Sequence, residues 1–76
     1  MATDKEWQDR TKGLLKAELK RRNLSYRELA ERLERLGIHE TERNIANKIS
    51  RGGFTAVFLF QCLEAIGVTE LNLRRP

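Results

Sequence analysis

The chain of 76 residues is long enough for one small domain and leaves no room for a second hydrophobic core. Hydrophobic residues make up 39% and charged residues 34%, a balance that fits a globular chain in water. The formal net charge of +4 suits an anionic partner without identifying it. The single cysteine, Cys62, excludes an internal disulfide, and no cluster of Cys and His residues offers a metal site.

Signals for membrane insertion and secretion are missing from the sequence. The longest apolar run, AVFLF at residues 56–60, is far too short to cross a bilayer. The N-terminal residues form no apolar signal region. We therefore expect a bacterial-type cytoplasmic protein with no membrane partner.

The first predicted helix covers residues 4–22. Thr3 and Glu6 have the spacing of a capping box, in which each side chain bonds to a backbone N–H of the other residue. Glu18 and Arg22, four residues apart, form a favourable charge pair. A separate stripe of lysines has no acid partner at this spacing: Lys12, Lys16 and Lys20. Such a stripe either reaches nucleic-acid phosphates or keeps a protein soluble, and we favour solubility.

The second predicted helix covers residues 25–36. Ser25 and Glu28 again have the spacing of a capping box. The apolar residues of this segment share one face: Leu29, Ala30, Leu33 and Leu36. Gly37 is a natural end for the helix, because glycine readily adopts the left-handed conformation that often follows a helical C-terminus.

The third predicted helix covers residues 41–51 and ends before two glycines. At about 100° of rotation per residue, Ile45 and Ile49 point inward. Lys48 lies on the flank, and five polar residues point outward: Arg43, Asn44, Asn47, Ser50 and Arg51. Asparagine stabilises an exposed helix less well than alanine or glutamate does, so two asparagines here favour a function over a merely solvated face.

The outward face of this third helix carries groups that can read DNA bases. An asparagine side chain both donates to and accepts from adenine, and an arginine donates two hydrogen bonds to guanine in the major groove. We therefore predict that Arg43, Asn44 and Asn47 read bases. The alternative is an ordinary helix with a wet outer face.

The fourth predicted helix covers residues 55–66 and has Thr55 as its N-cap. It is apolar nearly all round, which predicts either a central place in the core or a contact with another chain. We expect one face to point inward: Ala56, Leu59, Phe60, Leu63 and Ile66. Three other apolar residues form a candidate dimer patch: Phe54, Phe58 and Cys62. The alternative is that the first helix covers this patch.

The four predicted helices give an all-α protein, a compact four- to five-helix bundle in which residues 1–76 form a single domain. Three segments resemble phage-repressor-type domains of the Cro/cI or XRE-like class: LKAELKRRNLSYRELAERL, ISRGGF and FLFQCLEAIGV. The resemblance covers residues 14–68 and implies a lambda-repressor-like helix-turn-helix whose third helix enters the major groove. Ala30 and Gly52 are 22 residues apart, more than is usual in that family, which implies extra residues partly in a lengthened second helix and partly after Gly37.

A second resemblance is closer and covers residues 12–73. It is to a bacterial domain family of unknown function that carries NKISRG and a segment similar to FLQCLEAIG. This resemblance implies no established activity.

The resemblance to phage repressors also implies contacts with DNA phosphates. Tyr26 occupies the position at the start of the second helix from which that family contacts the backbone, and Arg27 lies beside it. We expect Lys48 and Arg51 to hold phosphates as well. Tyr26 is about equally well explained as a half-buried core residue. Two-fold dimers are common in that family, so a homodimer is a further expectation.

We therefore predict a DNA-binding protein, a transcriptional regulator, with double-stranded DNA as its partner and neither a cofactor nor a small-molecule substrate. His39 and Cys62 alone suggest catalysis, and neither has a base or an orienting group at a suitable spacing, so we expect no enzyme. The alternative is a protein–protein interaction module that keeps the helical scaffold and no longer reads DNA. RNA binding ranks third, because aromatic residues placed for base stacking are missing.

Overall fold

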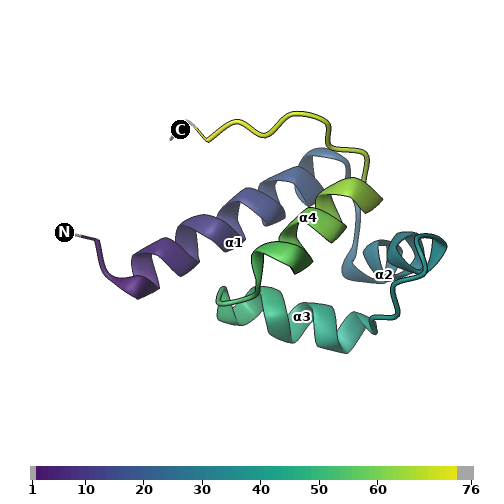
Figure 1. Ribbon diagram of the computed structural model, residues 1–76, viewed down its shortest axis with the longest axis horizontal. Coiled ribbons are helices and arrows are strands. Elements are labelled where there is room, and N and C mark those ends of the chain that lie inside the picture. Colours follow the sequence, from purple (N-terminus) through teal and green to yellow (C-terminus); the bar gives the residue numbers. More distant parts are fainter. Residues whose placement is uncertain (1, 74–76) are drawn as a thin grey trace.

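In the computed structural model, which describes residues 2–73, the chain forms four α-helices and no strand (Figure 1). These helices are α1 (Asp4–Arg21), α2 (Tyr26–Arg35), α3 (Glu42–Arg51) and α4 (Ala56–Ala65). The prediction of an all-α bundle is confirmed, and each predicted helix end lies within one residue of the observed end.

The helices begin where hydroxyl side chains cap them. Thr3 Oγ1 accepts a hydrogen bond from Glu6 N at 3.2 Å, and Ser25 Oγ accepts one from Glu28 N at 3.1 Å. In both cases the glutamate side chain bonds back to the N-cap, so both predicted capping boxes are present. Hydroxyl groups also cap the other two helices: Thr41 for α3 and Thr55 for α4. Local sequence therefore fixes where each helix starts.

All four helices contribute to one hydrophobic core. The second helix, α2, packs against α3 and α4, and α1 packs against the same two helices. In Figure 1, α4 crosses the long α1, with α3 below it and α2 to the right. The buried core residues are Leu15, Leu19, Leu29, Leu33, Ile45, Ile49, Phe58, Cys62, Leu63 and Ile66. The inward directions predicted for Ile45 and Ile49 are confirmed.

The fourth helix is turned differently from the prediction. Phe58 and Cys62, two members of the candidate dimer patch, are buried in the core, and Cys62 is 0% exposed. Phe54, the third member, is half-buried and packs edge-on against the Phe58 ring, with 5.4 Å between the ring centroids. The candidate dimer patch is therefore wrong. Phe60, which we expected to point inward, is 65% exposed.

The broad apolar surface of α4 explains this error. Its only two polar residues, Gln61 and Glu64, lie on the same side of the helix as Val57 and Phe60, a signal for the exposed side that the predicted inward position of Phe60 ignored. The opposite side packs against α1 and α2. This packing buries Phe58 and Cys62 with Leu63 and leaves Phe60 in solvent.

The buried position of Cys62 predicts that thiol reagents will not reach it while the protein is folded. Burial raises the pKa of the Cys62 thiol to about 12, so the reactive thiolate is scarce at neutral pH. A disulfide reagent added near the ordinary thiol pKa of about 8.5 should label the native protein only as fast as it unfolds. Urea-unfolded protein, the control, should react at once. Fast labelling of the native protein would contradict the buried position.

The second helix has ten residues, as do α3 and α4. Between Ala30 and Gly52, the residues 31–35 complete α2, the residues 36–41 form the connection, and the residues 42–51 form α3. Gly37 has a φ of +80° directly after the helix, as expected for a helix end. Ile38 of the connection packs against the core.

The third helix ends where α1 passes close to it. Gly52 has a φ of +73°, and a Cβ atom added there would lie 2.8 Å from the carbonyl oxygen of Gln8 in α1. Both the backbone conformation and the narrow space require glycine. This contact fixes the C-terminal end of α3 against α1.

Candidate nucleic-acid interface

The outward face of α3 is held in place by two fully buried isoleucines. Ile45 and Ile49 lie in the core one turn apart, so the opposite side of the helix faces solvent. This exposed side carries the residues predicted to lie there: Arg43, Asn44, Asn47, Ser50 and Arg51. The three residues proposed to read bases therefore share one accessible helix face.

The charged and amide side chains on the outward side of α3 have no partner among the residues that the structure describes. None of the side chains of Arg43, Asn44, Asn47 and Arg51 makes a hydrogen bond or ion pair with another residue in the range 2–73. The hydroxyl of Thr41, which caps α3, accepts its bond from the Asn44 backbone and leaves the Asn44 amide side chain free. Amide and guanidinium groups on this face are thus available to an external ligand.

A shallow pocket of about 590 Å³ runs along one edge of this face. Asn44, Asn47 and Arg51 line it from α3, and Gln8 and Phe54 line it from the neighbouring segments. The pocket places polar groups beside an aromatic ring at the base of the exposed helix.

Lys48 differs from the other residues predicted to contact DNA. Its ammonium group pairs with the carboxylate of Glu40 and lies 4.8 Å from the centroid of the Phe58 ring. The Glu40 side chain is only 11% exposed, so Lys48 neutralises a carboxylate that is largely removed from water. Lys48 thus ties the connection before α3 to α4, an internal role that its place on the helical wheel does not indicate.

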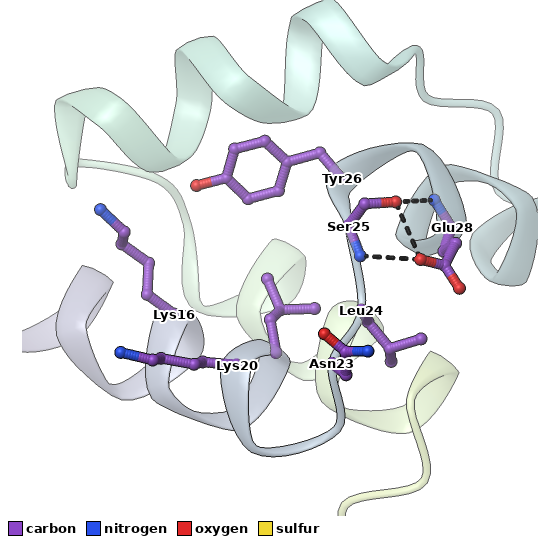
Figure 2. Close-up of a pocket in the computed structure, with 8 residues that line it drawn as sticks. Lys16, Lys20, Asn23, Leu24, Ser25, Tyr26 and Glu28 are labelled. Atoms are coloured by element: carbon purple, nitrogen blue, oxygen red, sulfur yellow. Dashed lines mark hydrogen bonds between the residues drawn. The ribbon is translucent and has the colours of Figure 1, made fainter.

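A second pocket, of about 500 Å³, opens between α1 and the start of α2. Figure 2 shows the Tyr26 ring extending toward Lys16, with Lys20 alongside on α1. Tyr26 is half-buried, as one of its two interpretations required, yet its hydroxyl bonds to no other residue that the structure describes. Arg27, the next residue, is exposed.

The lysine stripe of α1 divides into two parts. Lys12 Nζ donates to the Ser50 carbonyl oxygen of α3 at 3.1 Å and lies 3.6 Å from Asp9 Oδ1. A cation is favourable there, because the last carbonyl groups of a helix carry partial negative charge. Lys16 and Lys20 have no such partner among residues 2–73. The sequence did not reveal the pocket between α1 and α2, because Lys12, Lys16 and Lys20 look equivalent on a helical wheel.

Two arginines at the end of α1 are neutralised by one carboxylate. Arg21 Nη1 donates to Glu18 at 2.7 Å and Arg22 Nη1 donates at 2.6 Å, which confirms the predicted Glu18–Arg22 pair. The hydrogen bond from Arg21 is the main reason why the pKa of Glu18 is lowered, and Arg22 adds to it against the opposing effect of burial. These arginines are therefore less available to a ligand than Lys16 and Lys20.

Protonation of Glu18 should make the protein less stable in acid. Because the pKa of Glu18 is lowered by folding, its contribution is complete above the ordinary value of 4.5 and is lost as the pH falls through the folded value. Glu18→Gln should lower the free energy of unfolding at neutral pH and flatten its decline below this ordinary pKa. Urea unfolding at a series of pH values measures the effect, with Glu31→Gln on the exposed side of α2 as the control. An acid profile unchanged by Glu18→Gln would contradict the assignment.

Two further kinds of site are missing from the described part of the chain. No group of three His, Cys, Asp or Glu residues within 2–73 is arranged to hold a metal ion. No helix in that range is long and apolar enough to span a membrane.

The fold and its surface define a small four-helix protein with an exposed, polar third helix and a basic pocket beside it. A family model described as a domain of unknown function, DUF6471, matches residues 7–71. The chain belongs to this family. The match agrees with the resemblance to a family of unknown function, and nothing in the comparisons supports the resemblance to phage repressors. No curated protein and no solved structure matches the chain.

Proposed function

We propose that this protein binds double-stranded DNA in a sequence-specific manner and acts as a transcriptional regulator, with α3 in the major groove. The proposal rests on the amide and guanidinium groups on the outward face of α3, which bond to no other side chain or backbone group within residues 2–73. Glu42 is the one acidic residue of α3, so the helix as a whole suits an anionic groove. An α-helix fits the width of the major groove, where each base pair presents its own pattern of donors and acceptors.

The amide and guanidinium groups on the outward face of α3 each have a chemically defined role in this proposal. Asn44 and Asn47 suit adenine, which presents a donor and an acceptor side by side, and Arg43 suits the two acceptors of guanine. Arg51, one turn beyond Asn47, contacts a phosphate, as does Arg27 at the start of α2. Lys48 is the weakest of the four expected phosphate ligands, because its ammonium already pairs with Glu40.

The first test is an amide NMR titration of the labelled protein with a mixed-sequence DNA duplex at low and at near-physiological salt. Binding through α3 should shift Tyr26, Arg27 and the amides of residues 41–51, and these shifts should persist at the higher salt. Shifts confined to the α1 lysines and seen only at low salt would overturn the proposal, because any basic surface attracts DNA weakly under those conditions.

Asn47→Ala and Arg51→Ala should have different effects on binding. After a preferred site has been selected from a randomised duplex pool, Asn47→Ala should cost about 1–3 kcal/mol on that site and relax the preference at one base pair. Arg51→Ala should weaken all duplexes alike and lower the slope of log affinity against log salt by about 0.9. Fluorescence anisotropy measures both, with Lys5→Ala, an exposed residue near the start of α1, as the control. Equal losses on all sequences for both variants would refute this division of roles.

A protein contact through α4 is the second candidate, and the exposure of Val57 and Phe60, at 66% and 65%, favours it. Phe60 also lines an open groove of about 220 Å³ together with Val68 and Leu71. Sedimentation velocity over a range of protein concentrations tests whether a second copy binds there. Association that Val57→Ser and Phe60→Ser abolish would support a homodimer, and a monomer at every concentration would exclude it.

A further inference from the structure

We propose that Lys16, Lys20 and Tyr26 form a phosphate-binding pocket, which holds the DNA backbone beside α3. This inference rests on the proposed function and adds to it a specific anchoring site on α1 and α2. All three residues line the pocket shown in Figure 2, and both lysines are exposed. The ligand is the phosphodiester group of a nucleic-acid strand.

The two lysines are arranged unfavourably unless an anion joins them. They lie four residues apart on α1, and like charges at this spacing repel each other. Other cations of α1 have internal partners, since Lys5 pairs with Asp9 at 3.1 Å and Arg10 Nη2 donates to the Leu73 carbonyl at 2.8 Å. Lys16 and Lys20 bond to nothing in the described part of the chain. A phosphate between them would remove the repulsion.

Tyr26 supplies a neutral hydrogen-bond donor at the same place. The Tyr26 ring is half-buried, while its hydroxyl reaches solvent, bonds to no other residue in the range 2–73 and is directed toward Lys16 (Figure 2). This hydroxyl can therefore donate to an anion in the pocket. The backbone N–H groups of Tyr26 and Arg27 lie in the first turn of α2, before the intrahelical hydrogen bonds begin. The positive end of the helix therefore faces the same anion as the two ammonium groups.

One acidic residue, Glu28, also lines the pocket. Its Oε1 atom accepts hydrogen bonds from the Ser25 backbone N–H at 3.1 Å and from Ser25 Oγ at 3.0 Å. The capping box thus holds this carboxylate beside the serine (Figure 2). Its charge nevertheless opposes a bound phosphate, so Glu28→Gln should strengthen binding, because glutamine retains the capping geometry.

The pocket lies close enough to α3 to serve the same duplex. Lys12, one turn before Lys16 on α1, donates to the Ser50 carbonyl in the last turn of α3. The stripe of α1 therefore runs from the end of the proposed reading helix to the start of α2. A backbone strand that leaves the C-terminal end of α3 along α1 would meet Lys16 one turn beyond Lys12, and then Lys20.

The test compares the salt dependence of duplex binding for the wild type, Lys16→Gln/Lys20→Gln, Glu28→Gln and the control Lys5→Gln. A labelled mixed-sequence duplex and fluorescence anisotropy provide the affinities, and circular dichroism verifies that each variant is folded. Loss of two phosphate contacts should lower the slope of log affinity against log salt by about 1.8. When salt rises from about 50 to 150 mM, the affinity of both proteins falls. The factor by which it falls should be about seven times smaller for the double variant than for the wild type.

The outcomes separate this pocket from the proposed function. A lowered slope for the double variant, tighter binding by Glu28→Gln and an unchanged slope for Lys5→Gln support the pocket. If the wild type and the double variant bind DNA with the same slope of log affinity against log salt, the proposed phosphate site is refuted, and DNA binding through α3 is not affected. A wild type that binds no duplex at any salt concentration overturns both.

Discussion

Gly52→Ala is expected to lower the free energy of unfolding by about 2–4 kcal/mol, a large part of the total for so small a domain. Two costs combine at this position. The φ of +73° strains any residue with a Cβ atom, and that atom would also lie 2.8 Å from the Gln8 carbonyl oxygen. The contact is between two backbones, so relief requires α1 and the end of α3 to move apart.

Two other glycines separate these costs. Gly37 has a φ of +80°, and a Cβ atom added there would meet no other atom within 4 Å, so Gly37→Ala should cost about 1–2 kcal/mol from backbone strain alone. Gly13 lies in α1 with equally open surroundings, and Gly13→Ala should stabilise the protein by about 0.5–1 kcal/mol. Urea unfolding followed by circular dichroism measures all three. Equal losses for the changes at Gly52 and Gly37 would show that α1 does not press on the end of α3.

Leu33→Ala should strongly destabilise the core, with a loss of about 2–5 kcal/mol in the free energy of unfolding. Leu33 is 0% exposed on α2, the helix that packs against both α3 and α4. Removing its side chain leaves a cavity in the core that the four helices share. The free energy of unfolding of the whole domain is on the order of several kcal/mol. A substantial unfolded fraction without denaturant is therefore expected.

Leu36→Ala is the matched control for this change. Both residues belong to the apolar stripe predicted for the second helix, but Leu36 is 48% exposed at the C-cap of α2. Its truncation should cost well under half as much, because much of its surface already meets water. The same urea unfolding curves measure both variants. Similar losses for the two leucines would contradict the observed placement of α2.

The outward face of α3 was predictable because a short helix with two large apolar residues on one side can bury them in only one orientation. Ile45 and Ile49 fix the rotation of α3, and the polar residues follow on the opposite side. The pairing of Lys48 with Glu40 was not predictable. Glu40 lies in the irregular connection before α3, eight residues from Lys48, and no helical spacing brings the two side chains together. The pocket around Tyr26 was predictable only in part. The sequence suggested a role for Tyr26, but the packing of α1 beside the start of α2 is what brings Lys16 and Lys20 to the same pocket.

The sequence by itself determined the four helices, their ends and the polar face of α3, because capping, glycine conformation and helical periodicity act over a few residues. The buried side of α4 also follows from its sequence, because its only polar residues, Gln61 and Glu64, share one side with the exposed Val57 and Phe60. The tertiary structure alone decided which lysines find partners on other elements within residues 2–73. Lys48 pairs with Glu40 of the connection before α3, and Lys12 donates to the Ser50 carbonyl of α3, while Lys16 and Lys20 face the Tyr26 pocket.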